Sequence, residues 1–200
     1  MSDLQFAEVQ RDALAEMVNI GMGQAGDRLA RLFNTFIQLS VPRLELIQPR
    51  ALAGALDRLC GSATAVIGTR QAFASHIRGE AVVFFTAESC GELAELVGYP
   101  GADRNEVLLD ITNVLVGACI GGIAAQFALE LALSPPSLLG EAASATRLLD
   151  AGAMVWQTAL LSEVNFRVEA RLFHCHLVTF WPDASLQVLV KAVDDLLAAV

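Results

Sequence analysis

Acidic and amide side chains recur at helical spacing in two segments of this chain. The two sets are Asp12, Glu16 and Asn19, and Glu106, Asp110 and Asn113. Residues that stand three or four positions apart lie on one face of a helix. Each set therefore places a carboxylate and a carboxamide one turn apart. A carboxylate can pair with a cation, and an amide both donates and accepts hydrogen bonds, so the pair could hold a water molecule in a fixed direction.

The two sets belong to an internal repeat. An offset of 94 residues relates them, and the same offset relates Gly23 to Gly117 and Pro42 to Pro136. A constant shift over several positions indicates two related structural units. We predict one domain over residues 1–200, built from halves near 1–97 and 98–200 that pack with pseudo-twofold symmetry. The alternative is that both sets are the solvated faces of amphipathic helices, but the repeat favours a functional interpretation.

Helices must position these side chains. Apolar residues such as Leu14, Val18 and Leu108 stand beside the polar sets and can anchor the opposite helix faces in a core. We predict two consecutive helices over residues 4–33, broken near the glycines at positions 21 and 23. We predict a second helical block that starts at Asp103 or Asn105 and ends near Leu133, where a serine and two prolines follow.

The segments between the helical blocks have strand periodicity. We predict strands over residues 36–48 (interrupted by a proline), 62–72, 76–86, 153–163 and 166–180, with a turn near Asn165. Shorter helices are predicted over residues 49–59, 87–97, 142–149 and 185–199. Helical pairs combined with antiparallel hairpins predict an α+β fold in which an antiparallel sheet packs against helix pairs.

Composition narrows the functional classes. The chain is 54% hydrophobic and 18% charged, which is typical of an ordered domain, and its net charge of −9 argues against a nucleic-acid binder. The start lacks the basic and apolar stretch of a secretory signal. The apolar run Val114–Ala125 is too short to span a bilayer and predicts a buried helix. We expect a soluble, cytoplasmic protein that does not insert into membranes.

Several other signals have weaker functional interpretations. Residues 21–26 match the glycine pattern of dinucleotide sites, but helical periodicity precedes them where a strand is required. We expect these glycines to let two helices meet closely or bend. His174 and His176 share a strand face without a third metal ligand. The four cysteines form no CxxC pair and are predicted to be reduced and buried.

The first polar set resembles the CheC/CheX/FliY family of chemotaxis response-regulator phosphatases, and is closest to CheC. The family pattern is an acidic or serine residue, then glutamate, asparagine and, about twenty-two residues later, proline. Asp12, Glu16, Asn19 and Pro42 match it, as does the extension Asn19–Ala25. The second half carries Asp110 where the family has glutamate.

The resemblance implies hydrolysis of the aspartyl phosphate on a CheY-like receiver domain. Such hydrolysis needs a water in line with the scissile bond, and a side-chain amide can orient it. Asn19 and Asn113 are therefore the candidate water-orienting residues. The resemblance further implies that Glu16 pairs with the receiver's active-site lysine. The receiver would supply Mg²⁺, so we expect no cofactor bound by this chain itself.

The remaining motif residues have supporting roles in this hypothesis. Asp12, Glu106, Pro42 and Pro136 are predicted to shape the site or its interface. Asp110 is one methylene shorter than glutamate, which sets its carboxylate about 1 Å back, so we expect the second site to work less well or only to bind.

Two other hypotheses stay open at this stage. The chain could be a non-catalytic module that binds a receiver or a CheD-like deamidase. It could also be a FliY-type flagellar switch subunit, which we would expect to carry a further C-terminal domain.

Overall fold

The computed structural model describes residues 6–34, 36–40, 43–90, 101–149, 159–168 and 174–198. Its elements, in chain order, are α1 (Glu8–Phe33), β1 (Ile37–Leu39), β2 (Arg43–Ile47), α2 (Pro49–Cys60), β3 (Val66–Ala74), β4 (Arg78–Thr86), the 3₁₀-helix η1 (Ala87–Cys90), α4 (Arg104–Gln126), β5 (Ala132–Leu133), β6 (Ser137–Ala142), α5 (Ala145–Leu148), β7 (Ala159–Val168), β8 (His174–Phe180) and α6 (Asp183–Ala198).

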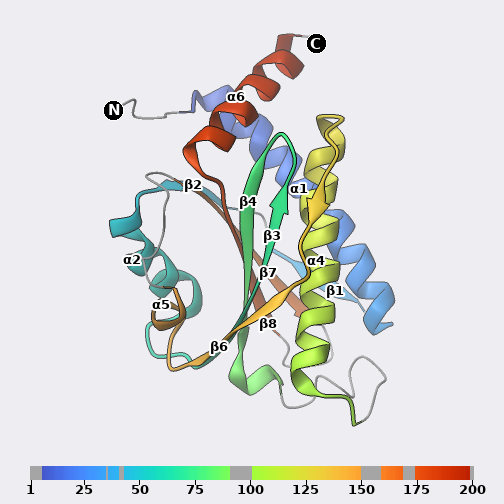
Figure 1. Ribbon diagram of the computed structural model, residues 1–200, viewed down its shortest axis with the longest axis vertical. Helices are drawn as coiled ribbons and strands as arrows, with labels where there is room; N and C mark the ends of the chain where they lie inside the picture. The colour runs from blue at the N-terminus through green and yellow to red at the C-terminus, as the bar shows by residue number, and fades with distance from the viewer. Residues whose placement is uncertain are drawn as a thin grey trace.

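A single antiparallel sheet separates two helical layers (Figure 1). Its strand order is β1-β7-β8-β4-β3-β5, with β2 also paired to β7 and β6 to β3. Alternate residues of the central strands face opposite sides: Val83 packs into the core beneath α1 and α4, whereas Val82 packs against α2 and α5. The α+β fold with an antiparallel sheet between helix pairs is confirmed.

The sheet also has the expected pseudo-twofold arrangement. Exchanging β1, β2, β3 and β4 with β5, β6, β7 and β8 leaves the pairing pattern unchanged. Val83 of β4 pairs with Leu177 of β8, and these two residues are themselves 94 positions apart. The approximate axis therefore passes between the two central strands, and it relates α1 to α4.

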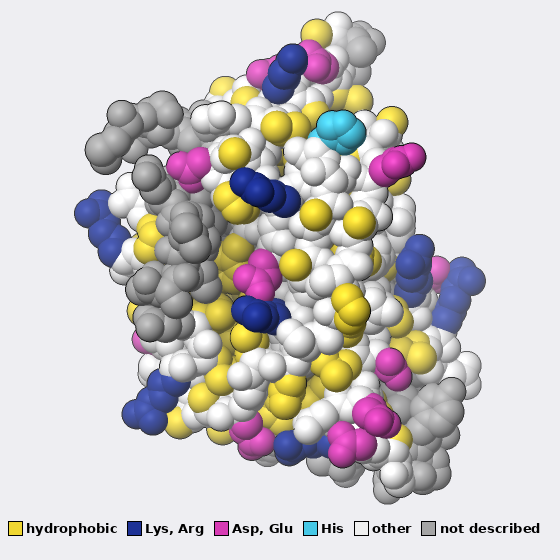
Figure 2. Space-filling model, viewed as in Figure 1, with side chains coloured by type: hydrophobic (Ala, Val, Ile, Leu, Met, Phe, Trp, Pro, Cys, Tyr) yellow, Lys and Arg dark blue, Asp and Glu magenta, His cyan; other side chains and the backbone are white. Residues whose placement is uncertain are grey.

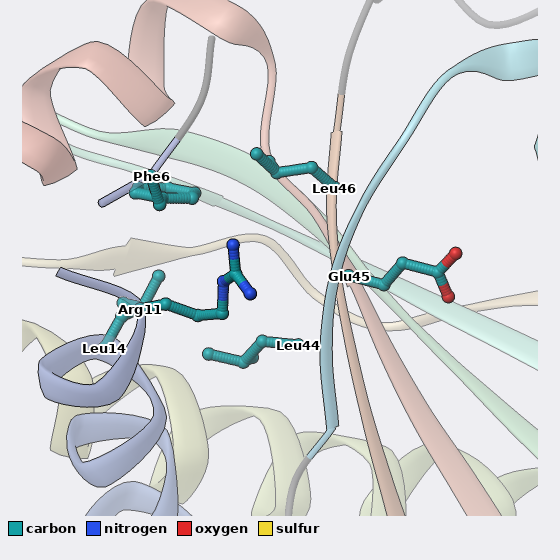
Figure 3. A pocket seen from close by; sticks show the side chains of 6 residues that line it. All are labelled: Phe6, Arg11, Leu14, Leu44, Glu45 and Leu46. Carbon is teal, nitrogen blue, oxygen red and sulfur yellow. The ribbon is translucent and has the colours of Figure 1, made fainter. Parts of the chain in front are cut away.

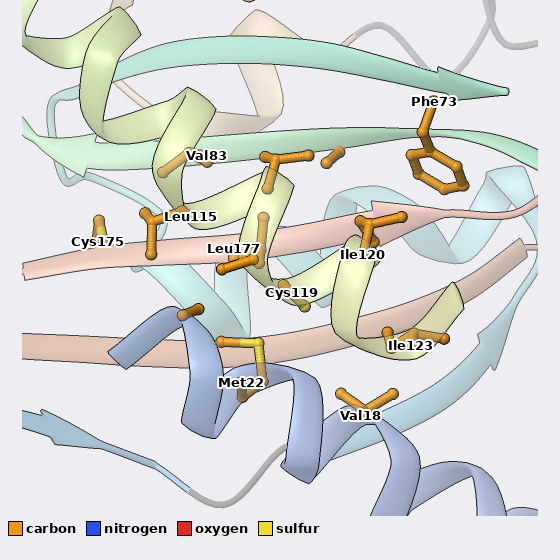
Figure 4. Packing of buried hydrophobic residues seen from close by; sticks show 14 of the residues in the cluster. Val18, Met22, Phe73, Val83, Leu115, Cys119, Ile120, Ile123, Cys175 and Leu177 are labelled. Atoms are coloured by element: carbon orange, nitrogen blue, oxygen red, sulfur yellow. The ribbon is translucent and has the colours of Figure 1, made fainter. Parts of the chain in front are cut away.

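Helices α1 and α4 cross at very short range because glycines occupy the crossing point. A Cβ on Gly21 would lie 2.6 Å from the carbonyl oxygen of Cys119, and a Cβ on Gly122 would lie 2.7 Å from the Cα of Gly21. Around this point, Val18 and Met22 of α1 pack with the apolar side chains of α4 (Figure 4). The expectation that the glycines allow two helices to meet closely is confirmed.

The predicted break at these glycines is wrong, because α1 is one continuous helix. A glycine destabilises a helix by about 1 kcal/mol relative to alanine. Here the buried side of α1, which includes Leu14, Ala25 and Leu29, outweighs that cost through its packing on the sheet and α4.

The predicted end of the second helical block near Leu133 is also wrong. The N-cap is Asp103, whose carboxylate accepts from the backbone N–H of Asn105 at 2.7 Å, but α4 ends at Gln126. Ala128 then adopts a left-handed φ of 52°, and the Leu129 N–H donates to the carbonyl of Ala124. This Schellman termination usually uses glycine, so the alanine concealed it in the sequence.

The other predicted helices and strands are in part confirmed, one predicted turn is wrong, and some predictions fall outside the described residues. The helices near 49–59 and 185–199 and the strands near 62–72 and 76–86 are confirmed. The turn near Asn165 is wrong, because this residue lies within β7 and pairs with His176 of β8. Pro42, the boundary near residues 97 and 98, and most of the predicted helix 87–97 lie outside the described residues.

The apolar run of α4 forms a core helix. Residues Arg104–Gln126 are long and apolar enough to cross a membrane by composition, with a mean hydropathy of 1.9, but most of that stretch is buried against the sheet and α1. The prediction of a buried helix for Val114–Ala125 is confirmed.

All four cysteines are buried thiols that form no disulfide, as expected. Burial raises the pKa of the Cys90 thiol from its ordinary value of 9.0 to about 11, with smaller effects from nearby charges. Burial alone raises the pKa of Cys119 to about 12. It also raises the pKa of Cys175, which Cys90 raises further. The fold therefore favours the neutral thiols.

This burial predicts alkaline destabilisation. A thiol whose pKa is higher in the folded state than in the unfolded state contributes to stability. This contribution is fully present below the pKa of the unfolded state, and it is lost as pH rises from about 9 towards about 11 to 12. Urea unfolding at several pH values should show a falling free energy of unfolding over this range. Cys119→Ala should reduce that pH dependence, and an unchanged dependence would contradict the assignment.

Candidate functional site

The first acid–amide pair lies on the outward face of α1. The side chains of Asp12, Glu16 and Asn19 are exposed, whereas Leu14 and Val18 between them are buried. Glu16 and Asn19 make no hydrogen bond or ion pair with any part of the chain that the structure describes. The two functional groups are therefore free to contact another molecule from a helix whose opposite face is fixed in the core.

The second pair has the corresponding place on α4. The side chains of Glu106, Asp110 and Asn113 are exposed, while Leu108 and Ile111 are buried. Pro136 is half-buried, and it follows Ser134, which exchanges two hydrogen bonds with Ala72 of β3. All described motif residues thus stand where the sequence places them on the two helices.

The two pairs form separate sites on one helical layer. Helices α1 and α4 run in opposite directions (Figure 1). Two contacts show this: Gln126 near the end of α4 donates to the Met17 carbonyl at 3.0 Å, and Cys119, which is earlier on α4, lies against Gly21, which is later on α1. Glu16 and Asn19 therefore lie beside the end of α4, and Asp110 and Asn113 lie on the far side of the crossing. Two partners could approach without sharing one site.

Two polar residues of β3 contact α4 near the second site, and one of them, Gln71, contacts Asn113 directly. The Thr69 and Thr112 hydroxyls are 2.6 Å apart, and the Gln71 amide nitrogen donates to the Asn113 Oδ1 at 2.9 Å. The 94-residue offset relates Thr112 to Val18, an apolar residue. The side chain of Asn113 is therefore restrained by the sheet, whereas that of Asn19 makes no hydrogen bond to the described residues.

The surface around Asn19 is also more open than the surface around Asn113. A Cβ on Gly23, one turn after Asn19, would meet nothing within 4 Å, and Ile20 beside it is 42% exposed. At the equivalent Gly117, a Cβ would lie 3.5 Å from the Leu133 side chain. The first asparagine thus has the more open approach.

A pocket of about 270 Å³ lies beside the start of α1 (Figure 3). Phe6, Leu44 and Leu46 surround it, and the Arg11 guanidinium points between them. Glu45 also lines the pocket, but its carboxylate points away and pairs with Arg58 at 3.1 Å. Glu16 and Asn19 do not line this pocket; they lie on the exposed face of α1.

The surface charge agrees with the acidic composition. On the described part of the face in Figure 2, Lys and Arg side chains are interspersed with Asp and Glu. The chain as a whole carries a net charge of −9. Such a surface does not offer the continuous basic tract that follows a phosphate backbone.

Comparison with known proteins identifies the motif of α1. Residues 9–46, which contain Asp12, Glu16 and Asn19, match the CheC-like family. The resemblance to the CheC/CheX/FliY family is confirmed. The CheC-like segment comprises most of α1, the strand β1 and nearly all of β2.

Solved structures share the whole fold. FliY from Thermotoga maritima matches with a TM-score of 0.70 and 13% identity over 96% of this chain and 99% of that chain. The FliM middle domain from H. pylori matches with a TM-score of 0.61 and 8% identity over 94% and 99%. A chain of the CheX–CheY–BeF3–Mg complex from Borrelia burgdorferi matches with a TM-score of 0.52 and 10% identity over 83% and 97%.

These likenesses establish the fold. The activity has to be inferred from the residues of the site. They extend over CheX-, FliY- and FliM-type proteins, so the closer resemblance of this chain to CheC stays a prediction.

Gln71 is the contact residue that the sequence interpretation missed. Its signal was a glutamine at an inward-facing position of a strand, two residues before Phe73, because buried polar side chains need a partner. The partner, Asn113, became visible only in three dimensions.

Proposed function

We propose that this chain is a phosphatase that hydrolyses the aspartyl phosphate of a CheY-like response regulator. One observation carries the proposal: Glu16 and Asn19 stand one turn apart on a helix anchored in the core, exposed and without a hydrogen-bond or ion-pair partner among the described residues. A rigid element of this kind places reactive groups better than a loop does.

The chemistry requires little of this chain beyond positioning. Hydrolysis of an acyl phosphate proceeds by in-line attack of water, with the negative charge spread over the phosphoryl oxygens. The Asn19 amide can accept a hydrogen bond from that water and donate to it or to a phosphoryl oxygen. Glu16 would pair with a lysine of the receiver, and Asp12 would flank this contact. The receiver's own Mg²⁺ would neutralise the phosphoryl charge, and no metal of this chain takes part.

The partner follows from the same geometry and from one relative. An exposed helix face suits insertion into another protein's phosphorylated pocket, and the CheX–CheY complex has a chain with this fold. The acidic residues of this face, Asp12 and Glu16, suit a basic group on that partner. We place this activity in the cytoplasm, where such receivers act.

A second candidate function is a non-catalytic module that binds a receiver or a CheD-like deamidase. The observation that favours it is the second site, where Asp110 replaces glutamate and the Asn113 oxygen already accepts from Gln71. Both functions can coexist, with turnover at the first site and binding at the second.

Incubation with a phosphorylated CheY-like receiver separates these functions. A phosphatase should accelerate phosphate loss well above the spontaneous rate of the receiver alone, and substoichiometric amounts should suffice. Unchanged or slower loss, combined with measurable binding to the beryllofluoride-activated receiver, would identify a binding module and contradict the proposal. Absence of both would exclude receivers of the type used.

A further inference from the structure

Gln71 is a buried amide that connects the sheet to the second site. Its side chain is almost completely buried, at 1% exposed. Its amide nitrogen lies 2.9 Å from the Asn113 Oδ1 and 2.7 Å from the backbone carbonyl of Ser134. Its own oxygen is buried and has no hydrogen-bond partner within the described residues.

The chemistry of these contacts fixes the orientation of both amides. A backbone carbonyl can only accept, so the Gln71 group that touches Ser134 must be the NH₂ group. The second hydrogen of this group points to Asn113, which must therefore present its oxygen to the sheet. The Asn113 NH₂ group then faces outward. Reversing Gln71 would set two acceptors 2.7 Å apart at Ser134.

We propose that Gln71 is a positioning residue that makes Asn113 a hydrogen-bond donor to the partner. In this arrangement the second site holds phosphoryl oxygens and does not orient the attacking water. This inference rests on the proposed function. Orienting a water requires an amide to present both its oxygen and its NH₂ group to that water. The Asn113 oxygen is directed at Gln71 and the sheet, which leaves the NH₂ group facing the partner. Holding an anionic phosphoryl oxygen requires only the outward N–H groups.

The segment just before the repeated proline also contributes to the second site. Ser134 is bound to β3 through its hydrogen bonds with Ala72, and Pro136 follows it directly before β6. This segment holds the carbonyl that fixes Gln71, and Gln71 in turn fixes Asn113. The buried oxygen of Gln71, which has no partner among the described residues, is destabilising by itself, so the two NH₂ contacts must offset its cost.

The test isolates the second site. In a Glu16→Ala, Asn19→Ala background, Gln71→Met removes the buried amide at similar volume and frees Asn113. The apparent KM for a phosphorylated CheY-like receiver should rise about threefold to tenfold, because a mobile side chain must be ordered on binding. The kcat at this site should not fall, and it should rise if the released amide begins to orient water. Binding of the beryllofluoride-activated receiver should weaken by a similar factor.

Two further variants keep the result interpretable. Thr69→Val removes the neighbouring polar contact between β3 and α4 and should leave KM and kcat at their background values. Gln71→Asn keeps an amide that is too short to span both contacts, so it should reproduce Gln71→Met even if the latter folds poorly. A fall in kcat at constant KM in the Gln71 variants would overturn the inference, because Asn113 would then be a water-orienting residue that Gln71 preorganises. Equal behaviour of the Gln71 and Thr69 variants would overturn it as well.

The failure of the proposed function has a different signature. In that case the unmodified protein would neither dephosphorylate nor bind the receiver. The nuclear magnetic resonance signals of the Asn113 side-chain amide would still report on its restraint. They should shift in Gln71→Met and remain in place in Thr69→Val, and no shift in Gln71→Met would overturn the positioning role itself.

Discussion

Replacing Asn19 with alanine is expected to remove most of the dephosphorylation of a CheY-like receiver, on the order of a hundredfold at its own site. The physical reason is that the water loses the amide that directs it along the line of attack, and misplacement by about 1 Å has an effect of this size. Asn113→Ala should lower the total rate less than about twofold, because Asp110 is shorter than glutamate and the Asn113 oxygen is engaged by Gln71. Single-turnover loss of receiver phosphate measures both.

The matched control is Gln24→Ala, which removes another exposed amide from α1. Gln24 stands five residues after Asn19 and therefore points to a different side of the helix. This variant should retain the full rate. A larger loss in Asn113→Ala than in Asn19→Ala would reverse the ranking of the two sites, and equal small losses would remove both asparagines from the mechanism.

Gly122→Ala is expected to destabilise the fold by about 1–3 kcal/mol, because the new Cβ would lie 2.7 Å from the Cα of Gly21. That atom belongs to the backbone of a packed helix and cannot move aside as a flexible side chain can. The clash should outweigh the gain of about 1 kcal/mol that alanine normally brings to a helix. Urea unfolding gives the change in the free energy of unfolding directly.

Gly121→Ala is the matched control, since a Cβ at this neighbouring position of α4 meets nothing within 4 Å. It should leave stability unchanged or raise it by up to about 1 kcal/mol through helix propensity. If Gly122→Ala proved as well tolerated as Gly121→Ala, the close crossing of α1 and α4 would be wrong. The relative placement of the two acid–amide sites would then need revision.

The motif, the offset and the fold class were accessible from the sequence because each depends on local spacing. Asp12, Glu16 and Asn19 share a helix face by periodicity alone, and the same holds for their counterparts 94 residues later. The run of β-branched and aromatic residues at positions 82–85 likewise predicted the strand that is β4. These features need no knowledge of what each element packs against.

The errors fall where tertiary packing overrides local preference. Gly21 is a helix breaker by propensity, but in the fold it is the residue that lets α4 approach α1. Asn165 favours turns, yet it lies in a strand paired on both sides. Ala128 ends α4 in a left-handed conformation that usually signals glycine.

By itself, the sequence determined that this chain carries two acid–amide pairs on two related helices, because helical periodicity fixes which side chains share a face. Only the tertiary structure decided that the pairs differ. Asn19 is exposed and makes no hydrogen bond within the described part of the chain, whereas Gln71, 42 positions from Asn113 along the chain, reaches across from the sheet to hold Asn113. A contact between residues so far apart has no local signature, since it depends on how α4 lies over β3.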